Sequence, residues 1–99
     1  MTYSRIDGEQ QTILRVSGNL DAMTAPGLMP VVESIIADTC ERVIVDLSEL
    51  DLIDSSGVAA IVALYKRVRN YGGKVEVSGA RDQPLSIFRL LRMDRVFSM

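Results

Sequence analysis

The most constraining feature of the chain is a short apolar run, Val43-Ile44-Val45, within residues 42–47. Consecutive apolar side chains would project from both faces of a β-strand. Such strands are typical of the middle of a largely parallel sheet covered by helices, whereas half-exposed antiparallel strands alternate apolar and polar residues. The run therefore predicts an α/β fold with this strand inside the sheet.

An amphipathic helix is predicted on each side of this strand. The helix before it follows Thr24, an expected N-cap, and has Pro26 in its first turn, where the missing N–H does no harm. The apolar face of this first helix has helical spacing and consists of Leu28, Val31, Val32, Ile35 and Ile36. A last amphipathic helix is predicted near the end of the chain, over residues 83–91.

The helix that follows the strand is predicted over residues 56–70. Ser55 or Asp54 is its expected N-cap, and Gly72-Gly73 ends it. Small residues in it allow close approach to neighbouring elements. Its apolar stripe consists of Val58, Ile61, Val62, Tyr65 and Val68.

A hairpin is predicted at the start of the chain. Residues 11–17 alternate apolar and polar side chains, and residues 3–6 could pair with them through a turn at Asp7-Gly8. Gly18-Asn19-Leu20-Asp21 is expected to break the strand.

The remaining elements complete a single domain over residues 1–99. A last strand is predicted over residues 74–78, and residues 48–53 are expected to form a loop. The expected fold is α/β, with a mixed four- to five-stranded β-sheet, helices packed on it, and the order β-β-α-β-α-β-α. A chain of 99 residues with 47% hydrophobic and 24% charged residues is long enough for one such globular domain.

Composition excludes most catalytic chemistry. The chain has no histidine, so it cannot supply a Ser-His-Asp triad, a histidine-activated cysteine or a histidine metal ligand. The single Cys40 excludes an internal disulfide and fits a reducing cytoplasm. The longest apolar run, residues 58–65, is too short to span a membrane, and Arg5, Asp7 and Glu9 interrupt any signal-peptide core. We expect a cytoplasmic protein that is not an enzyme.

Charge is divided unevenly along the chain. Residues 1–65 hold three basic and ten acidic side chains, whereas residues 66–99 hold eight basic and three acidic ones. The overall charge is −2, and the five aromatic residues form no stacking set, so a nucleic-acid partner is not expected. The acidic part favours a face that meets a basic partner, although scattered solvated charges would explain it almost as well.

Residues 46–57 form the most informative motif, Asp46-Leu47-Ser48-Glu49-Leu50-Asp51-Leu52-Ile53-Asp54-Ser55-Ser56-Gly57. It leads from the buried strand to a helix N-terminus that carries two hydroxyl groups. A phosphate is stable at such a place, because the first N–H groups of a helix are unpaired and its dipole is positive there.

Simpler explanations exist for each residue of this motif. Ser55 and Ser56 are also preferred helix caps. The carboxylates Asp46, Asp51 and Asp54 could suggest a metal or acid–base site, but solvation and capping are the simpler roles, because no other residue completes such a site. The motif is not a hydrolase nucleophile elbow, which needs a glycine two residues before the serine.

Several segments, in order along the chain, resemble the STAS domains, and among them the bacterial anti-sigma-factor antagonists. The resemblance covers residues 13–97, which is almost the whole chain. Its landmarks are Gly18-Asn19-Leu20-Asp21 with Thr24-Ala25, Val43-Ile44-Val45-Asp46-Leu47, Ile53-Asp54-Ser55-Ser56-Gly57, Gly72-Gly73-Lys74-Val75 and Leu91-Arg92-Met93-Asp94-Arg95-Val96-Phe97.

The resemblance implies a regulator that switches partners in signal transduction and transcription regulation. Such antagonists bind an anti-sigma factor that is also a serine-protein kinase, and the kinase phosphorylates the position of Ser55. Ser56 matches a neighbouring hydroxyl position that is not the usual acceptor. A metal-dependent serine phosphatase restores binding. The implied partner-binding residues are Asp21, Asp54, Ser55, Ser56 and Gly57, with no catalytic residue, cofactor or metal site in the chain itself.

Two alternatives and one departure remain. The chain could be a STAS domain that serves another partner without a phospho-switch, such as a lipid-transport or transporter subunit or a stress-signalling assembly. A small nucleotide-binding protein or enzyme is disfavoured, because no G-x-x-x-x-G-K-[ST] loop is present.

Many family members continue into another helix, so we expect Phe97 and Met99 to be unusually exposed. We expect a monomer when the chain is free.

Overall fold

A computed structural model describes residues 1–99 and contains one five-stranded sheet and three helices. In chain order the elements are β1 (Thr2–Gly8), β2 (Gln11–Leu20), α1 (Ala25–Ala37), β3 (Arg42–Asp46), β4 (Leu50–Ile53), α2 (Ser55–Asn70), β5 (Lys74–Ser78) and α3 (Asp82–Leu90). Strand β2 pairs antiparallel with β1 and parallel with β3, and β3 pairs parallel with β5. A short strand, β4, pairs parallel with the last residues of β2. The α/β fold and the mixed sheet are therefore confirmed.

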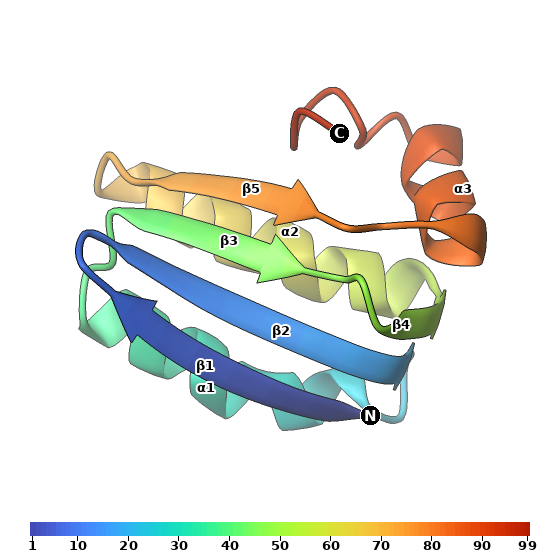
Figure 1. The fold of residues 1–99 in the computed structure, drawn as a ribbon, viewed down its shortest axis with the longest axis horizontal. Coiled ribbons are helices and arrows are strands. Elements are labelled where there is room, and N and C mark those ends of the chain that lie inside the picture. Colours follow the sequence, from blue (N-terminus) through green and yellow to red (C-terminus); the bar gives the residue numbers. More distant parts are fainter.

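Helices α1 and α2 lie side by side on one face of the sheet, and α3 lies at its end (Figure 1). Val43 and Val45 of β3 point into the core beneath these helices and are fully buried. Ile44 projects to the other face, beside Ile13 of β2, and both are only half-buried. The position of β3 inside the sheet is confirmed, and helices α1 and α2 cover only one of its faces.

The core is built from the predicted apolar positions. Val58, Ile61 and Val68 of α2 are buried, and Val62 and Tyr65 are half-buried at the edge of the stripe. Leu64 is also buried, which makes the apolar face wider than predicted. The other buried core side chains include Leu14, Val16, Leu28, Val31, Val32, Ile35, Val75, Val77 and Phe88.

Two predicted boundaries at the start of the chain are wrong. The hairpin turn lies at Glu9-Gln10 rather than at Asp7-Gly8, because Gly8 already pairs with Gln11 and Gln10 takes the left-handed backbone (φ +64°). Strand β2 also does not end at Ser17. Gly18, at φ +83°, permits a bulge, after which the strand continues to Leu20 and pairs with β4.

Residues 48–53 are not simply a loop, because they contain β4. This strand was missed because only the bulged end of β2, some thirty residues earlier in the chain, supplies its partner.

The expected exposure of Phe97 is also wrong. Its ring is 1% exposed and makes edge contacts with Tyr65 (5.4 Å) and Phe88 (5.9 Å), while Met99 is 37% exposed.

Candidate functional site

The predicted site lies where β4 runs into α2, and Asp54 is the helix cap there. Asp54 has extended backbone angles, and its Oδ1 accepts a hydrogen bond from Gly57 N at 3.0 Å. Ser55 is the first residue of α2 and is exposed, whereas Ser56 is half-buried. Because the carboxylate provides the cap, helix capping does not require the Ser55 hydroxyl.

The other contacts of Asp54 fix the loop that follows β2. Its Oδ2 accepts a hydrogen bond from Ala22 N at 3.2 Å, and its own N–H donates to Leu20 O at 3.1 Å. The end of β2, the loop after it and the start of α2 are thereby joined at one residue. The structure thus brings the predicted loop residue Asp21 next to the predicted helix start.

Asp21 closes its loop through main-chain hydrogen bonds. Its Oδ1 accepts from Met23 N at 3.0 Å and from Thr24 N at 3.1 Å. The Thr24 N–H lowers the pKa of Asp21 most. Partial burial opposes this effect, but the Met23 N–H adds to it, so the pKa stays below its ordinary value. The carboxylate is therefore ionised at neutral pH and half-exposed.

Thr24 occupies the predicted N-cap position of α1 but does not cap the helix with its side chain. Its hydroxyl instead donates to Asn19 O at 2.9 Å and accepts from Asp21 N at 2.9 Å. The prediction of a side-chain cap is therefore wrong. These two hydrogen bonds stabilise the loop that carries Asp21.

Gly57 is buried at the junction of α2 with β2 and β4. A Cβ atom at this position would lie 2.6 Å from Leu20 O and 2.7 Å from Ile53 Cγ1. No side chain fits such a gap without movement of the main chain. The structure thus places Gly57 where it sets how closely the start of α2 approaches the sheet, and not at the surface.

Gln83 of α3 also belongs to this site, although its sequence position gave no sign of it. Its Oε1 accepts from Ile53 N at 2.9 Å, and its Nε2 donates to Ile53 O at 2.8 Å. A hollow of about 230 Å³ lies between Gln83 and the loop after β2. It is lined by Asn19, Leu20, Asp21, Leu52, Ile53, Asp54 and Gln83.

The three carboxylates of the motif have separate environments. Asp46 accepts from Arg15 Nε (3.0 Å) and from Ser48 N (2.9 Å); burial opposes ionisation, but these donors lower its pKa below the ordinary value. Asp51 is exposed on β4, and Asp54 caps α2. No group of three or more acidic or cysteine side chains lies close enough together to hold a metal ion.

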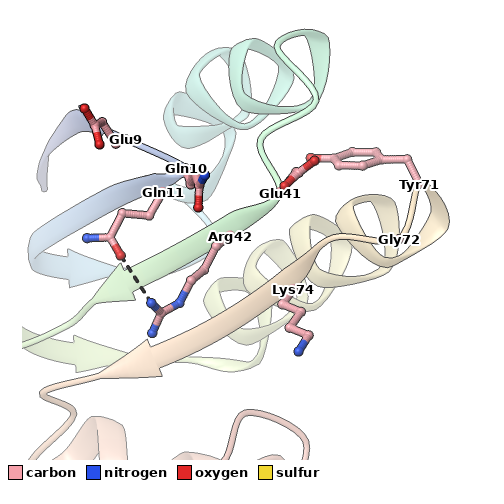
Figure 2. Close-up of a pocket in the computed structure, with 8 residues that line it drawn as sticks. All are labelled: Glu9, Gln10, Gln11, Glu41, Arg42, Tyr71, Gly72 and Lys74. Carbon is pink, nitrogen blue, oxygen red and sulfur yellow. Dashed lines mark hydrogen bonds between the residues drawn. The ribbon is translucent and has the colours of Figure 1, made fainter.

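A polar hollow of about 490 Å³ lies at the other end of the domain (Figure 2). There Arg42 donates to Gln11 (3.4 Å) and to Glu76 (3.0 Å). The hollow adjoins the last residues of α2, roughly 24 Å along the helix from Ser55. It is lined by Glu9, Gln10, Gln11, Glu41, Arg42, Tyr71, Gly72 and Lys74, and so contains none of the predicted site residues.

Comparison with known proteins agrees with the fold and the motif. The model of the STAS domain family matches residues 3–99. The chain belongs to the STAS domain family. This STAS domain is 34% identical over 88 residues to an anti-sigma F factor antagonist of Paenibacillus polymyxa, an alignment that covers 88% of this chain and 73% of the relative.

Solved structures resemble this STAS domain over nearly its whole length. An anti-sigma factor antagonist from Mycobacterium paratuberculosis superposes with a TM-score of 0.85 at 25% identity, covering 97% of this chain and 81% of that one. The Bacillus cell fate determinant SpoIIAA in its phosphorylated form superposes with a TM-score of 0.73 at 15% identity, covering 96% and 99%. None of the helices of this STAS domain is long and apolar enough to cross a membrane.

Proposed function

We propose that this STAS domain is an anti-sigma-factor antagonist whose binding is switched off by phosphorylation of Ser55. The observation that carries the proposal is the position of Ser55, an exposed hydroxyl at the first residue of α2, directly after the carboxylate cap Asp54. The similarity to the Paenibacillus polymyxa antagonist supports the choice of partner class.

The proposed partner is an anti-sigma factor that is also a serine-protein kinase. It transfers the γ-phosphoryl group of ATP to Ser55 Oγ, so that the Oγ–P bond forms, the bond to ADP breaks and the hydroxyl proton is released. A serine phosphatase then hydrolyses the phosphoserine and restores the hydroxyl. The antagonist itself contributes no catalytic residue and acts as a monomer in the cytoplasm, where sigma factors work.

The surface around Ser55 fits a basic partner. Asp21 and Asp54 lie on adjoining segments, and their carboxylates accept hydrogen bonds from main-chain N–H groups rather than from arginine or lysine. Their negative charge is therefore available to a partner and would speed its association. Ser56 faces a mostly apolar groove between α1 and α2, which favours Ser55 over Ser56 as the phosphoacceptor.

The test begins with capture of the kinase on this chain from its host, followed by incubation with ATP. We expect phosphate-affinity electrophoresis and mass spectrometry to find one phosphoserine, at Ser55. Ser55→Ala should abolish it, and the matched variant Ser56→Ala should retain it. Phosphorylation of Ser55→Ala, or capture of only transporter or stress-assembly proteins with Ser55 unmodified, would overturn the proposal and favour a STAS domain without a phospho-switch.

A further inference from the structure

The side chain of Gln83 brackets one residue of β4. Its amide both accepts from Ile53 N (2.9 Å) and donates to Ile53 O (2.8 Å). This is the pair of hydrogen bonds that a neighbouring strand would make to a residue of a sheet. Strand β4 has only four residues and pairs with β2 alone, so the Gln83 amide serves in place of a second neighbouring strand.

The bracketed residue directly precedes the predicted phosphoacceptor segment. Asp54, next in the chain, is held by Leu20 O through its N–H and holds Ala22 N and Gly57 N through its carboxylate. Ser55 follows. Contacts from β2 and its loop therefore restrain one side of this segment, and the Gln83 bracket restrains the other.

The start of α3 is built to hold Gln83 in this place. Asp82 has a left-handed backbone (φ +50°), a conformation that is uncommon for residues other than glycine, although aspartate tolerates it. Arg81 donates to Ser48 O at 3.0 Å, and Phe88 anchors the helix in the core. The amide thus projects from a fixed element.

We propose that Gln83 is a positioning residue for the phosphorylation of Ser55: by bracketing Ile53, it holds residues 53–55 in the conformation that the kinase recognises. The proposal rests on the proposed function. Without the bracket, water replaces the amide and residues 53–55 sample other conformations, so that only a fraction of the molecules is competent to bind.

That loss has a characteristic kinetic form. If the competent fraction falls to about one tenth, the apparent dissociation constant, and with it KM, rises about tenfold. The rate of phosphoryl transfer from the bound, competent conformer is unchanged, so kcat stays near the wild-type value. Global unfolding would lower the competent fraction in the same way, so thermal denaturation must show that each variant stays folded at the assay temperature.

The test uses Gln83→Met, which keeps the length of the side chain but cannot form the bracket. Gln11→Met is the matched control, because Gln11 is also half-buried and hydrogen-bonds Arg42 at the far end of the domain. Amide hydrogen exchange by NMR measures the Ile53 N–H, and KM and kcat are measured with the captured kinase and ATP. Gln83→Glu keeps the acceptor for Ile53 N but loses the donor for Ile53 O.

We expect Ile53 to exchange at least about tenfold faster in Gln83→Met, with an intermediate rate in Gln83→Glu and the wild-type rate in Gln11→Met. KM should rise about tenfold in Gln83→Met, by less in Gln83→Glu and not at all in Gln11→Met, at unchanged kcat. Unchanged Ile53 exchange, or faster exchange with unchanged KM, overturns the role of Gln83 while leaving the proposed function intact. A wild-type chain that the captured kinase does not phosphorylate overturns both.

Discussion

The two ends of the domain satisfy their charged groups in different ways. At the far end, charges pair with each other: Arg5 contacts Asp7 (2.9 Å) and Asp38 (2.6 Å), and Arg42 contacts Glu76 (3.0 Å). At the start of α2, Asp21 and Asp54 take part in no such pair and accept hydrogen bonds from main-chain N–H groups.

This difference makes the start of α2 the end that suits a regulated interface. Main-chain N–H groups hold a carboxylate in position, but they carry only partial charges and leave its negative charge available to a partner. An ion pair neutralises both of its members within the chain. At the start of α2, Asp21 and Asp54 are therefore held by hydrogen bonds without a salt bridge, whereas Arg5 and Arg42 at the far end are paired within the chain.

The largest effect is expected from a change in the part that both ends share. Ile61 lies in the buried face of α2 and is 1% exposed. Ile61→Ala should cost about 2–5 kcal/mol of the free energy of unfolding, because it removes buried methyl groups and leaves a cavity. Thermal denaturation should show a fall in Tm of at least about 8 °C. A fall of less than a couple of degrees would show that Ile61 does not hold the core.

A smaller effect should separate the two ends. Gly57→Ala places a Cβ against Leu20 O at 2.6 Å, so the start of α2 must move, at a cost of about 1–3 kcal/mol. Gly8→Ala is the matched control near the far end, since its Cβ would meet nothing closer than 3.7 Å. Urea denaturation should show a loss for Gly57→Ala and almost none for Gly8→Ala; equal losses would contradict the close approach at Gly57.

Asp54 combines a cap with a charge, and two variants can separate them. Asp54→Ala should lose about 0.5–2 kcal/mol of stability, because Gly57 N loses its partner, whereas Asp54→Ser keeps a capping oxygen. Both variants should associate more slowly with the basic partner at low salt, as should Asp21→Ala, because each removes a negative charge that forms no salt bridge. Stopped-flow association measures this rate, and a wild-type rate for Asp54→Ser would remove that charge from the interface.

The smallest expected effect is a difference in salt response between Asp7 and Asp21. The Arg5 guanidinium, followed by the Thr12 hydroxyl, lowers the pKa of Asp7, whereas the Thr24 N–H is the main cause of the lowered pKa of Asp21. Because both pKa values are lowered in the folded state, each group stabilises the fold above its ordinary pKa, and this contribution is lost as the pH falls through the lowered value.

Salt screens an exposed ion pair more than it weakens a main-chain hydrogen bond. NMR titration in high salt should therefore raise the pKa of Asp7 toward its ordinary value and raise that of Asp21 less. The reverse order would contradict the difference drawn between the two ends of the domain.

Local patterns were sufficient to predict most of the fold. The run Val43-Ile44-Val45 indicated an inner strand, and the apolar spacing in α2 located Ile61 in the core, because both depend on short stretches of chain. Strand β4 and the burial of Phe97 depend on partners far along the chain, namely the end of β2 and the rings of Tyr65 and Phe88.

The candidate site was predicted less completely. Asp54, Ser55 and Gly57 are adjacent in the sequence, so a motif could locate them at a helix start. Gln83 touches the same segment from 30 residues away and through side-chain-to-main-chain hydrogen bonds. Such contacts leave no periodic signal, because any residue can supply the main-chain groups.

The most direct test compares the affinity of the captured kinase for the Ser55-phosphorylated and the unmodified chain by isothermal titration calorimetry. A phosphate adds a charge of about −1.5 to −2 next to Asp54, and the helix N-terminus tolerates it, so the fold should remain and the complex should weaken. We expect a loss of about 3–4 kcal/mol, two to three orders of magnitude in Kd, with Tm near the wild-type value. Ser55→Ala should bind like the unmodified chain. Equal affinity of the phosphorylated and unmodified chains would contradict the proposed switch.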